Sequence, residues 1–134
     1  MKTAILSLQT AIYNRLSNDI QLAAKITGVY DAVDENTVFP YVTLGNGDTV
    51  NNWSTGTWYG EELTHTIHVW SRYKGKKEAI EIMNLIINAL TQPLSLDGGF
   101  LVEFTQLEFM EVLSDPDDIT RHGVMRYRFK IRNL

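Results

Sequence analysis

HTIHVWSRYKGKKEAIEIMNLIINAL, the stretch from His65 to Leu90, contains the two patterns from which the fold class follows. Thr, Ile, Val, Trp and Tyr dominate its first part, which predicts a strand over Glu62–Tyr73. The second part predicts a helix over about 76–91, which Pro93 ends. The apolar face of this helix is expected to consist of Ala79, Ile80, Met83, Ile86, Ile87 and Leu90. The stretch therefore predicts a strand, a turn and a helix.

Two short patterns within this stretch resemble chemical motifs. His65 and His68 are three apart, so on a strand they point to opposite faces and cannot share a metal ion. We expect a packed His65 and an outward His68. The sequence Gly75–Lys77 lacks the upstream Gly of a phosphate-binding loop, and Glu78 stands where that loop needs Ser or Thr. A basic helix N-terminus that holds an anion is the alternative to a turn with solvated lysines.

The flanking segments place the chain in the α+β class. We expect an antiparallel or mixed β-sheet with two main helices packed on one face, and a single domain over residues 1–134. The C-terminal strands follow each other without a helix, which argues against an alternating α/β fold. The other predicted elements are helices at Thr3–Ser17 (with Thr3 as N-cap) and Asp19–Ile26 (with Asp19 as N-cap), and strands at 29–33, Tyr41–Gly45, Phe100–Leu113 (with a bulge near Gln106 and Leu107) and 124–134.

Composition limits the function classes. The 134 residues are 44% hydrophobic and 21% charged, with a net charge of −4 and no cysteine. Disulfides, thiolate zinc sites and cysteine nucleophiles are thereby excluded. An acidic chain with a pI near 5.3 is not expected to bind nucleic acid over its whole surface. No apolar run approaches the ~18 residues of a membrane span, so we expect a cytosolic protein with no membrane partner.

No constellation of residues meets the requirements of an enzyme site. Asn52–Gly56 lacks the first Gly of a nucleophile elbow. Asp115, Asp117 and Asp118 lack the Gly and the closing Glu of a calcium loop. Glu61 and Glu62 are adjacent and diverge on a strand. We therefore expect no enzyme, no catalytic residue, no metal and no cofactor.

The first candidate for a partner interface is a long mobile loop at about 46–60. It carries Trp53, Trp58 and Tyr59 among Gly, Asn and Thr residues. Large aromatic side chains in a polar loop are typical anchors of protein interfaces. The alternative is that at least one tryptophan folds back onto the core.

The second candidate is a basic ladder on the last strand. Strict alternation places Met125, Tyr127, Phe129 and Ile131 on one side and the basic ladder, Arg126, Arg128, Lys130 and Arg132, on the other. Four like charges over ~20 Å repel unless they are paired. They are either paired across the sheet with Glu103, Glu108 and Glu111 or form an outward stripe for a partner protein or a nucleic acid backbone. The residues alone therefore also allow a small α+β binding module that recognises a cytosolic protein or nucleic acid through the basic strand.

Several segments resemble one known family. The resemblance spans Leu8 to Ile131 and is most specific at Trp70–Ala79 and Arg121–Gly123. The family is that of the tail-completion proteins of long-tailed bacteriophages (siphophages), also called tail terminators or head-to-tail joining proteins, and length and order point to a Bacillus phage. The segments that carry the resemblance are LQTAIYNRLSND, GVYDAV, FPYVTLG, the stretch His65–Leu90 and TRHGVMRYRFKI.

This resemblance implies a non-catalytic virion assembly protein at the head–tail interface. Such proteins are monomers in solution and form a ring, typically a hexamer, on the tail tube. The ring stops tube growth and joins the tail to the head connector or stopper. The implied partners are further copies of the chain, the tail tube protein and the connector, with genomic DNA close by in the channel. The loop Gly47–Gly60 resembles the family's variable loop, which orders on assembly.

Overall fold

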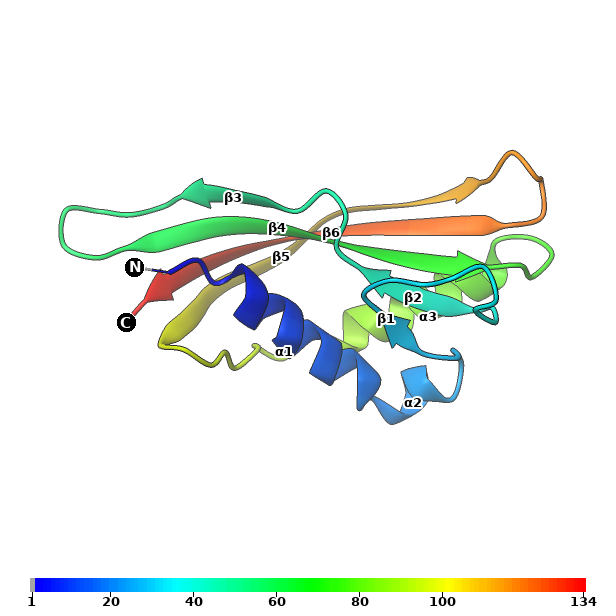
Figure 1. Cartoon of the computed structure of the whole chain (residues 1–134), viewed down its shortest axis with the longest axis horizontal. Coiled ribbons are helices and arrows are strands. Elements are labelled where there is room, and N and C mark those ends of the chain that lie inside the picture. The colour runs from blue at the N-terminus through cyan, green and yellow to red at the C-terminus, as the bar shows by residue number, and fades with distance from the viewer. Residues whose placement is uncertain (1) are drawn as a thin grey trace.

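The fold is built around three long antiparallel strands. A computed structural model describes residues 2–134. The strand order is β1-β2-β4-β6-β5, and β3 pairs with β4 on the same side as β2 (Figure 1). The β1–β2 pair is parallel and the other pairs are antiparallel, so the sheet is mixed. The strands are β1 (Val29–Tyr30), β2 (Tyr41–Leu44), β3 (Thr49–Asn52), β4 (Gly60–Ser71), β5 (Phe100–Ser114) and β6 (Arg121–Asn133).

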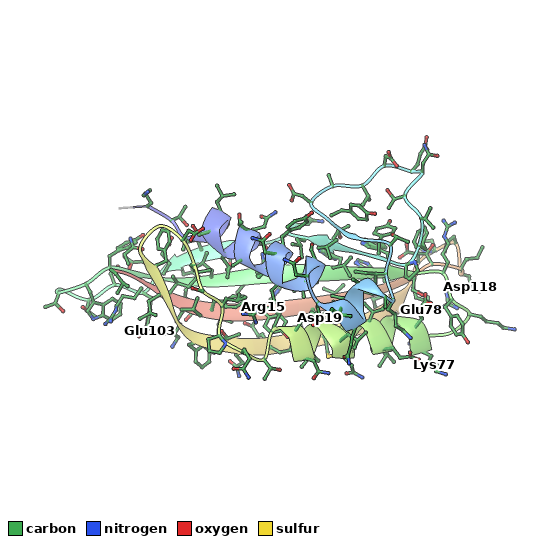
Figure 2. All side chains as sticks on the ribbon, turned by 90° about the horizontal axis from the view of Figure 1, so that it is seen from below. Arg15, Asp19, Lys77, Glu78, Glu103 and Asp118 are labelled. Atoms are coloured by element: carbon green, nitrogen blue, oxygen red, sulfur yellow. The ribbon has the colours of Figure 1, made fainter. Side chains whose placement is uncertain are left out.

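Helices cover one face of this sheet, which confirms the predicted α+β class. They are α1 (Ile5–Ser17), α2 (Ile20–Ala23) and α3 (Lys77–Ala89). Figure 2 shows the two main helices, α1 and α3, lying across the strands on the same side. None of the helices described within residues 2–134 is both long and apolar enough to cross a membrane.

The predicted helix starts and ends are partly confirmed. Asp19 caps α2 as predicted, because its side chain accepts a hydrogen bond from the Leu22 N–H at 2.9 Å. The prediction of Thr3 as the N-cap of the first helix is wrong. Helix α1 starts after Ala4, whose N–H donates instead to Oε1 of the buried Glu61 at 2.8 Å. The prediction of helix up to Ile26 is also wrong, because α2 has only 4 residues.

The core lies between the helices and one face of the sheet. The alternation of β6 is confirmed, since Met125, Tyr127, Phe129 and Ile131 are all buried. The predicted face of α3 is partly wrong. Ile80 is 42% exposed, whereas Ile82 is fully buried and was not predicted. With isoleucines on several sides of this helix, the spacing alone did not fix which of them faces the sheet.

Helix α3 packs closely on the sheet at Gly123 on β6. A Cβ atom at Gly123 would lie 2.9 Å from the Met83 sulfur and 3.3 Å from the Val69 Cβ. Gly123→Val is therefore expected to lower the free energy of unfolding by about 1–3 kcal/mol through overpacking. Urea unfolding measures this loss, and Met83→Ala in the same chain should recover part of it. An unchanged midpoint for Gly123→Val would contradict the close approach.

Strand β5 contains two irregularities. Its register with β6 shifts between Val102 and Phe104 and again between Leu107 and Phe109. The second shift confirms the bulge predicted near Leu107, and the first was not predicted. The extra residues are Glu103 and Glu108. Each bulge keeps the following phenylalanine in register with the basic ladder, Phe104 opposite Lys130 and Phe109 opposite Arg126.

The segment 46–60 is a hairpin arm rather than a loop without secondary structure. Residues Thr49–Asn52 form β3 and pair with β4, from Thr49 opposite Thr64 to Asn52 opposite Glu61. All four β3 residues are exposed, so this strand has no apolar alternation that the sequence could reveal. The prediction of a loop is wrong for these four residues.

Candidate partner-binding face

The two predicted interface candidates meet on one surface. The basic ladder lies on the sheet face opposite the helices, which we call the open face. The hairpin arm places its two tryptophans over the same end of the ladder. The Lys130 Nζ lies 5.4 Å from the centre of the Trp53 ring, and the Arg132 Cζ lies 5.6 Å from the centre of the Trp58 ring. Both distances allow cation–π attraction.

Trp53 and Trp58 form a half-buried pair. Their ring centroids are 4.9 Å apart at an angle of 66°, which is an edge-to-face contact. The backbone N–H of Trp53 donates to the Gly60 carbonyl at 2.8 Å. A Cβ atom at Gly60 would lie 2.6 Å from the Trp58 ring and 3.0 Å from the Trp53 ring, so the pair needs a glycine there. Both indoles thus fold back onto the sheet, but they pack on its open face and not on the core, so the alternative that at least one of them joins the core is wrong.

Tyr59 takes a different part in the hairpin arm. Its backbone carbonyl accepts a hydrogen bond from the Asn133 N–H at 2.8 Å, which ties the arm to the end of β6. Among residues 2–134, no aromatic or cationic contact joins the Tyr59 ring to the tryptophan pair. Of the three aromatic residues predicted as anchors, the structure therefore brings two together.

The bulges of β5 supply carboxylates to the basic ladder. Glu103 Oε1 lies 3.2 Å from the Arg132 Nε, and Glu108 Oε2 lies 4.0 Å from the Arg128 Nε. These are two of the three glutamates predicted as cross-strand partners. The third, Glu111, forms none of the ion pairs found within residues 2–134. The side chains are about one-third exposed, so each pair contributes little to stability.

Further contacts hold the middle of the ladder. Arg128 also lies 3.9 Å from Glu62 on β4 and donates to the Gln106 side-chain oxygen at 2.8 Å. Arg126 has no carboxylate partner within residues 2–134 and lies over Phe109, with 5.6 Å between its Cζ and the ring centre. Among residues 2–134, Arg128 and Arg132 therefore have carboxylate partners, whereas Arg126 and Lys130 contact aromatic rings instead.

Phe104 and Phe109 are open-face residues that sequence reasoning missed. Their side chains remain partly exposed beside Lys130 and Arg126. The signal that could have found them is a repeated Glu-Phe pair, at 103–104 and 108–109, because each pair marks one bulge. The open face thus combines aromatic rings, arginines and carboxylates, a composition suited to a protein partner.

A buried polar contact fixes the root of the hairpin arm. His65 is buried as predicted, and its Nδ1 lies 2.9 Å from Asp48 Oδ2. The other Asp48 oxygen accepts from the Thr66 N–H at 3.0 Å. Burial alone would raise the pKa of Asp48, but the hydrogen bonds from His65 and Thr66 outweigh it and lower the pKa. Asp48 therefore stabilises the fold above the pKa of its unfolded state, and this contribution is lost in acid.

His68 lies on the opposite face from His65, as predicted, but the outward, exposed placement is wrong. His68 is buried, its Nε2–H donates to the Gly45 carbonyl at 3.1 Å, and its Nδ1 lies 2.8 Å from His122 Nε2. His122 in turn stacks on Trp70, with ring centroids 3.8 Å apart. Burial, and then the neighbouring His68, lower the pKa of His122.

This histidine pair predicts a pH dependence. The ordinary pKa of 6.5 applies to His122 in the unfolded chain, and its pKa in the fold is lower. Below pH 6.5 the His122 side chain binds a proton more readily in the unfolded chain than in the fold. The free energy of unfolding should therefore decrease as the pH is lowered from 6.5, until the pH passes the lower pKa of the folded state. Urea unfolding from pH 7.5 to 5 measures the slope, and His122→Gln should reduce it. Equal slopes for both proteins would contradict the assignment.

Comparisons with known proteins agree with the resemblance. Residues 10–132 match the family described as Tail completion protein gp17. The tail completion protein gp17 of Bacillus phage SPP1 is 29% identical over 132 residues, which cover 98% of this chain and 97% of that protein.

Two solved structures share the fold. A chain in the virion of a native gene transfer agent particle is 25% identical, with a TM-score of 0.89 over 99% of this chain and 100% of that chain. The structure of bacteriophage SPP1 gp17 is 26% identical, with a TM-score of 0.67 over 96% of this chain and 91% of that chain. These matches show a structural tail protein with a place in the virion, and the chain belongs to the Tail completion protein gp17 family.

Proposed function

We propose that this protein caps the tail tube and joins the tail to the head connector without catalysing a reaction. The observation that supports this most strongly is the match along nearly the whole chain to tail completion proteins and to a chain of a virion particle. Residues 1–134 act as one tail-completion domain. Copies assemble in the host cytoplasm into a ring of six on the end of the tail tube, where the tube protein and the connector or stopper are the partners.

The open face is the proposed contact surface for these partners. In the free chain, the two tryptophan rings pack against Lys130 and Arg132 of the basic ladder through cation–π contacts. The part of the hairpin arm beyond β3, residues 53–59, rearranges on assembly, so that Trp53, Trp58 and Tyr59 bury apolar area against a neighbouring protein, at about 25 cal/mol per Å². The cost of reordering the arm offsets part of this gain. Free copies therefore remain monomeric, and the ring forms at the tail end.

A protein partner is favoured over nucleic acid by the charge pairing on the open face. Glu62, Glu103 and Glu108 lie within 4.0 Å of ladder arginines. Such carboxylates reduce the positive field that a phosphate backbone requires. Proximity to genomic DNA in the channel is part of the proposal, but recognition of DNA by the ladder is not.

Charge reversal in the ladder should block joining. Arg128→Glu would place a third carboxylate between Glu62 and Glu108. We expect loss of head–tail joining, with a loss of about 1 kcal/mol in the free energy of unfolding from like charges across the sheet. Lys77→Glu is the matched control, because Lys77 is 77% exposed on α3, away from the open face. Normal joining by Arg128→Glu would mean that the ladder has only an internal role.

Complementation tests the proposed function. Cells infected by the source virus with a stop codon in this gene provide heads and tails that lack the protein. Purified protein added to this extract should restore infectious particles, and restoration should saturate as the tail ends are filled. Failure of the wild-type protein to restore infectivity would contradict a role in joining.

A further inference from the structure

Among residues 2–134, the edge strands of the sheet are β1, β3 and β5, and β1 has only 2 residues, which leaves β3 and β5 as the longer free edges. Strand β5 pairs only with β6, and β3 pairs only with β4 on the other side of the sheet. Along each edge, backbone N–H and C=O groups are left without strand partners. Such edges are templates for pairing with another chain. Two different free edges on one molecule suit a head-to-tail contact between copies.

The two edges lie at the same level along the strands. In this half of the sheet the strands run side by side in the order β3, β4, β6, β5 (Figure 1). Paired residues connect the edges in straight rows. A second copy rotated about an axis along the strands, without a shift along that axis, would bring its β3 beside β5 of the first. Two of these rows are Thr49–Thr64–Arg128–Gln106 and Asn51–Glu62–Lys130–Phe104.

Strand direction also matches, and the two segments overlap over three residues. The three pairings across the sheet are all antiparallel, so β3 and β5 of one copy run in opposite directions. The neighbour's β3 would therefore meet β5 as an antiparallel partner, with Gln106 opposite Thr49 and Phe104 opposite Asn51. The regular part of β5 between its two bulges is Phe104–Leu107, and in this register Thr49–Asn51 of β3 lie opposite Phe104–Gln106, while Asn52 falls opposite the bulge residue Glu103. The bulges at both ends limit pairing to this segment.

The chemistry of the two edges is compatible. Thr49–Asn52 carries no charge, so Glu103 and Glu108 of β5 would meet no like charge on it. Val50 and Phe104 are both partly exposed in the single chain, and each would gain apolar cover. A ladder of three residues is short, which is consistent with copies that stay apart until the tail end holds them together.

We propose that adjacent copies in the assembled ring pair β5 of one copy with β3 of the next, which joins their sheets into one continuous antiparallel sheet. This inference rests on the proposed function, since it assumes that copies assemble side by side on the tail. It identifies the hairpin arm as a contact between copies and predicts which residues meet there.

Cysteine cross-linking tests the contact, because the chain has no cysteine of its own. A Thr49→Cys preparation and a Gln106→Cys preparation are mixed, bound to tails made without the protein, oxidised mildly and sedimented with the tails. Opposed Cβ atoms on paired strands are about 4.5–5.5 Å apart, close enough for a disulfide after small movements. We expect the mixture to form more disulfide-linked dimer than either preparation forms by itself. Asn51→Cys with Gln106→Cys detects a register shifted by two residues.

Thr49→Cys mixed with Lys77→Cys is the control, because Lys77 lies at the start of α3 on the helix-covered side. The strand pairing would be overturned if tail-bound protein restored infectivity but formed no more disulfide-linked dimer than this control in either register. The proposed function would be unaffected by that result. Absence of the wild-type protein from the sedimented tails would instead contradict the proposed function.

Discussion

Phe129→Ala is expected to lower the free energy of unfolding by about 3–5 kcal/mol, the range for removal of a fully buried aromatic side chain. Phe129 is 0% exposed and lies in the buried row of β6 between the sheet and the helices. Its loss leaves a cavity that the long paired strands cannot close by moving. Urea unfolding followed by far-ultraviolet circular dichroism measures the change.

Phe104→Ala is the matched control for this prediction. Phe104 lies on the neighbouring strand opposite Lys130, on the open face, and is 37% exposed. We expect a loss of less than about 1 kcal/mol, because the ring leaves no closed cavity when it is removed. Similar losses for the two variants would contradict the division of the sheet into a core face and an open face.

Trp53→Ala and Trp58→Ala should each weaken binding to tails by at least about tenfold, as expected for a buried aromatic anchor of an interface. Each change should cost only about 1 kcal/mol in folding, because the indole pair lies on the open face and not in the core. Labelled protein, sedimented with tails over a range of concentrations, gives the affinity.

Trp70→Ala controls for a general effect of losing an indole. Trp70 lies at the other end of the sheet, where it stacks on His122 and donates to the Thr43 hydroxyl at 3.1 Å. Its removal should lower stability but leave tail affinity within about twofold, as for a residue outside the contact. The assignment of the hairpin arm as a partner contact would be contradicted by an unchanged tail affinity for both Trp53→Ala and Trp58→Ala. An equal loss of tail affinity for Trp70→Ala would also contradict it.

Local patterns in the sequence predicted the elements whose causes are local. Strict alternation in residues 124–134 predicted β6 and its buried row, because in a half-buried strand the polarity of each side chain shows whether it faces the core or the solvent. Asp19 was predicted as a cap because the capping hydrogen bond spans three residues. The α+β class followed from the order of such elements.

Features that depend on distant residues were not predicted. Strand β3 exists because β4 provides its hydrogen-bond partners, and its own exposed residues give no pattern. His68 is buried because His122, far along the chain, packs against it. Pairing partners of this kind are set by sheet register, which one strand's sequence does not contain.

The candidate face was predicted in parts but not as a whole. The aromatic residues of the arm and the basic ladder were each identified from composition and alternation. Their convergence depends on the pairing of β3 with β4 and of β4 with β6. The bulges that bring Glu103 and Glu108 to the ladder depend on β5 having two more residues than its partner requires. These are properties of the assembled sheet.

Electron microscopy of lysates from the source virus, with a stop codon in this gene, examines the joining role in the infected cell. The proposed function predicts DNA-filled heads beside unattached tails, and tails of uncontrolled length if the protein also stops tube growth. Wild-type protein supplied from a plasmid should restore joined particles. Intact, infectious particles in the absence of the protein would contradict the proposed role in joining heads to tails.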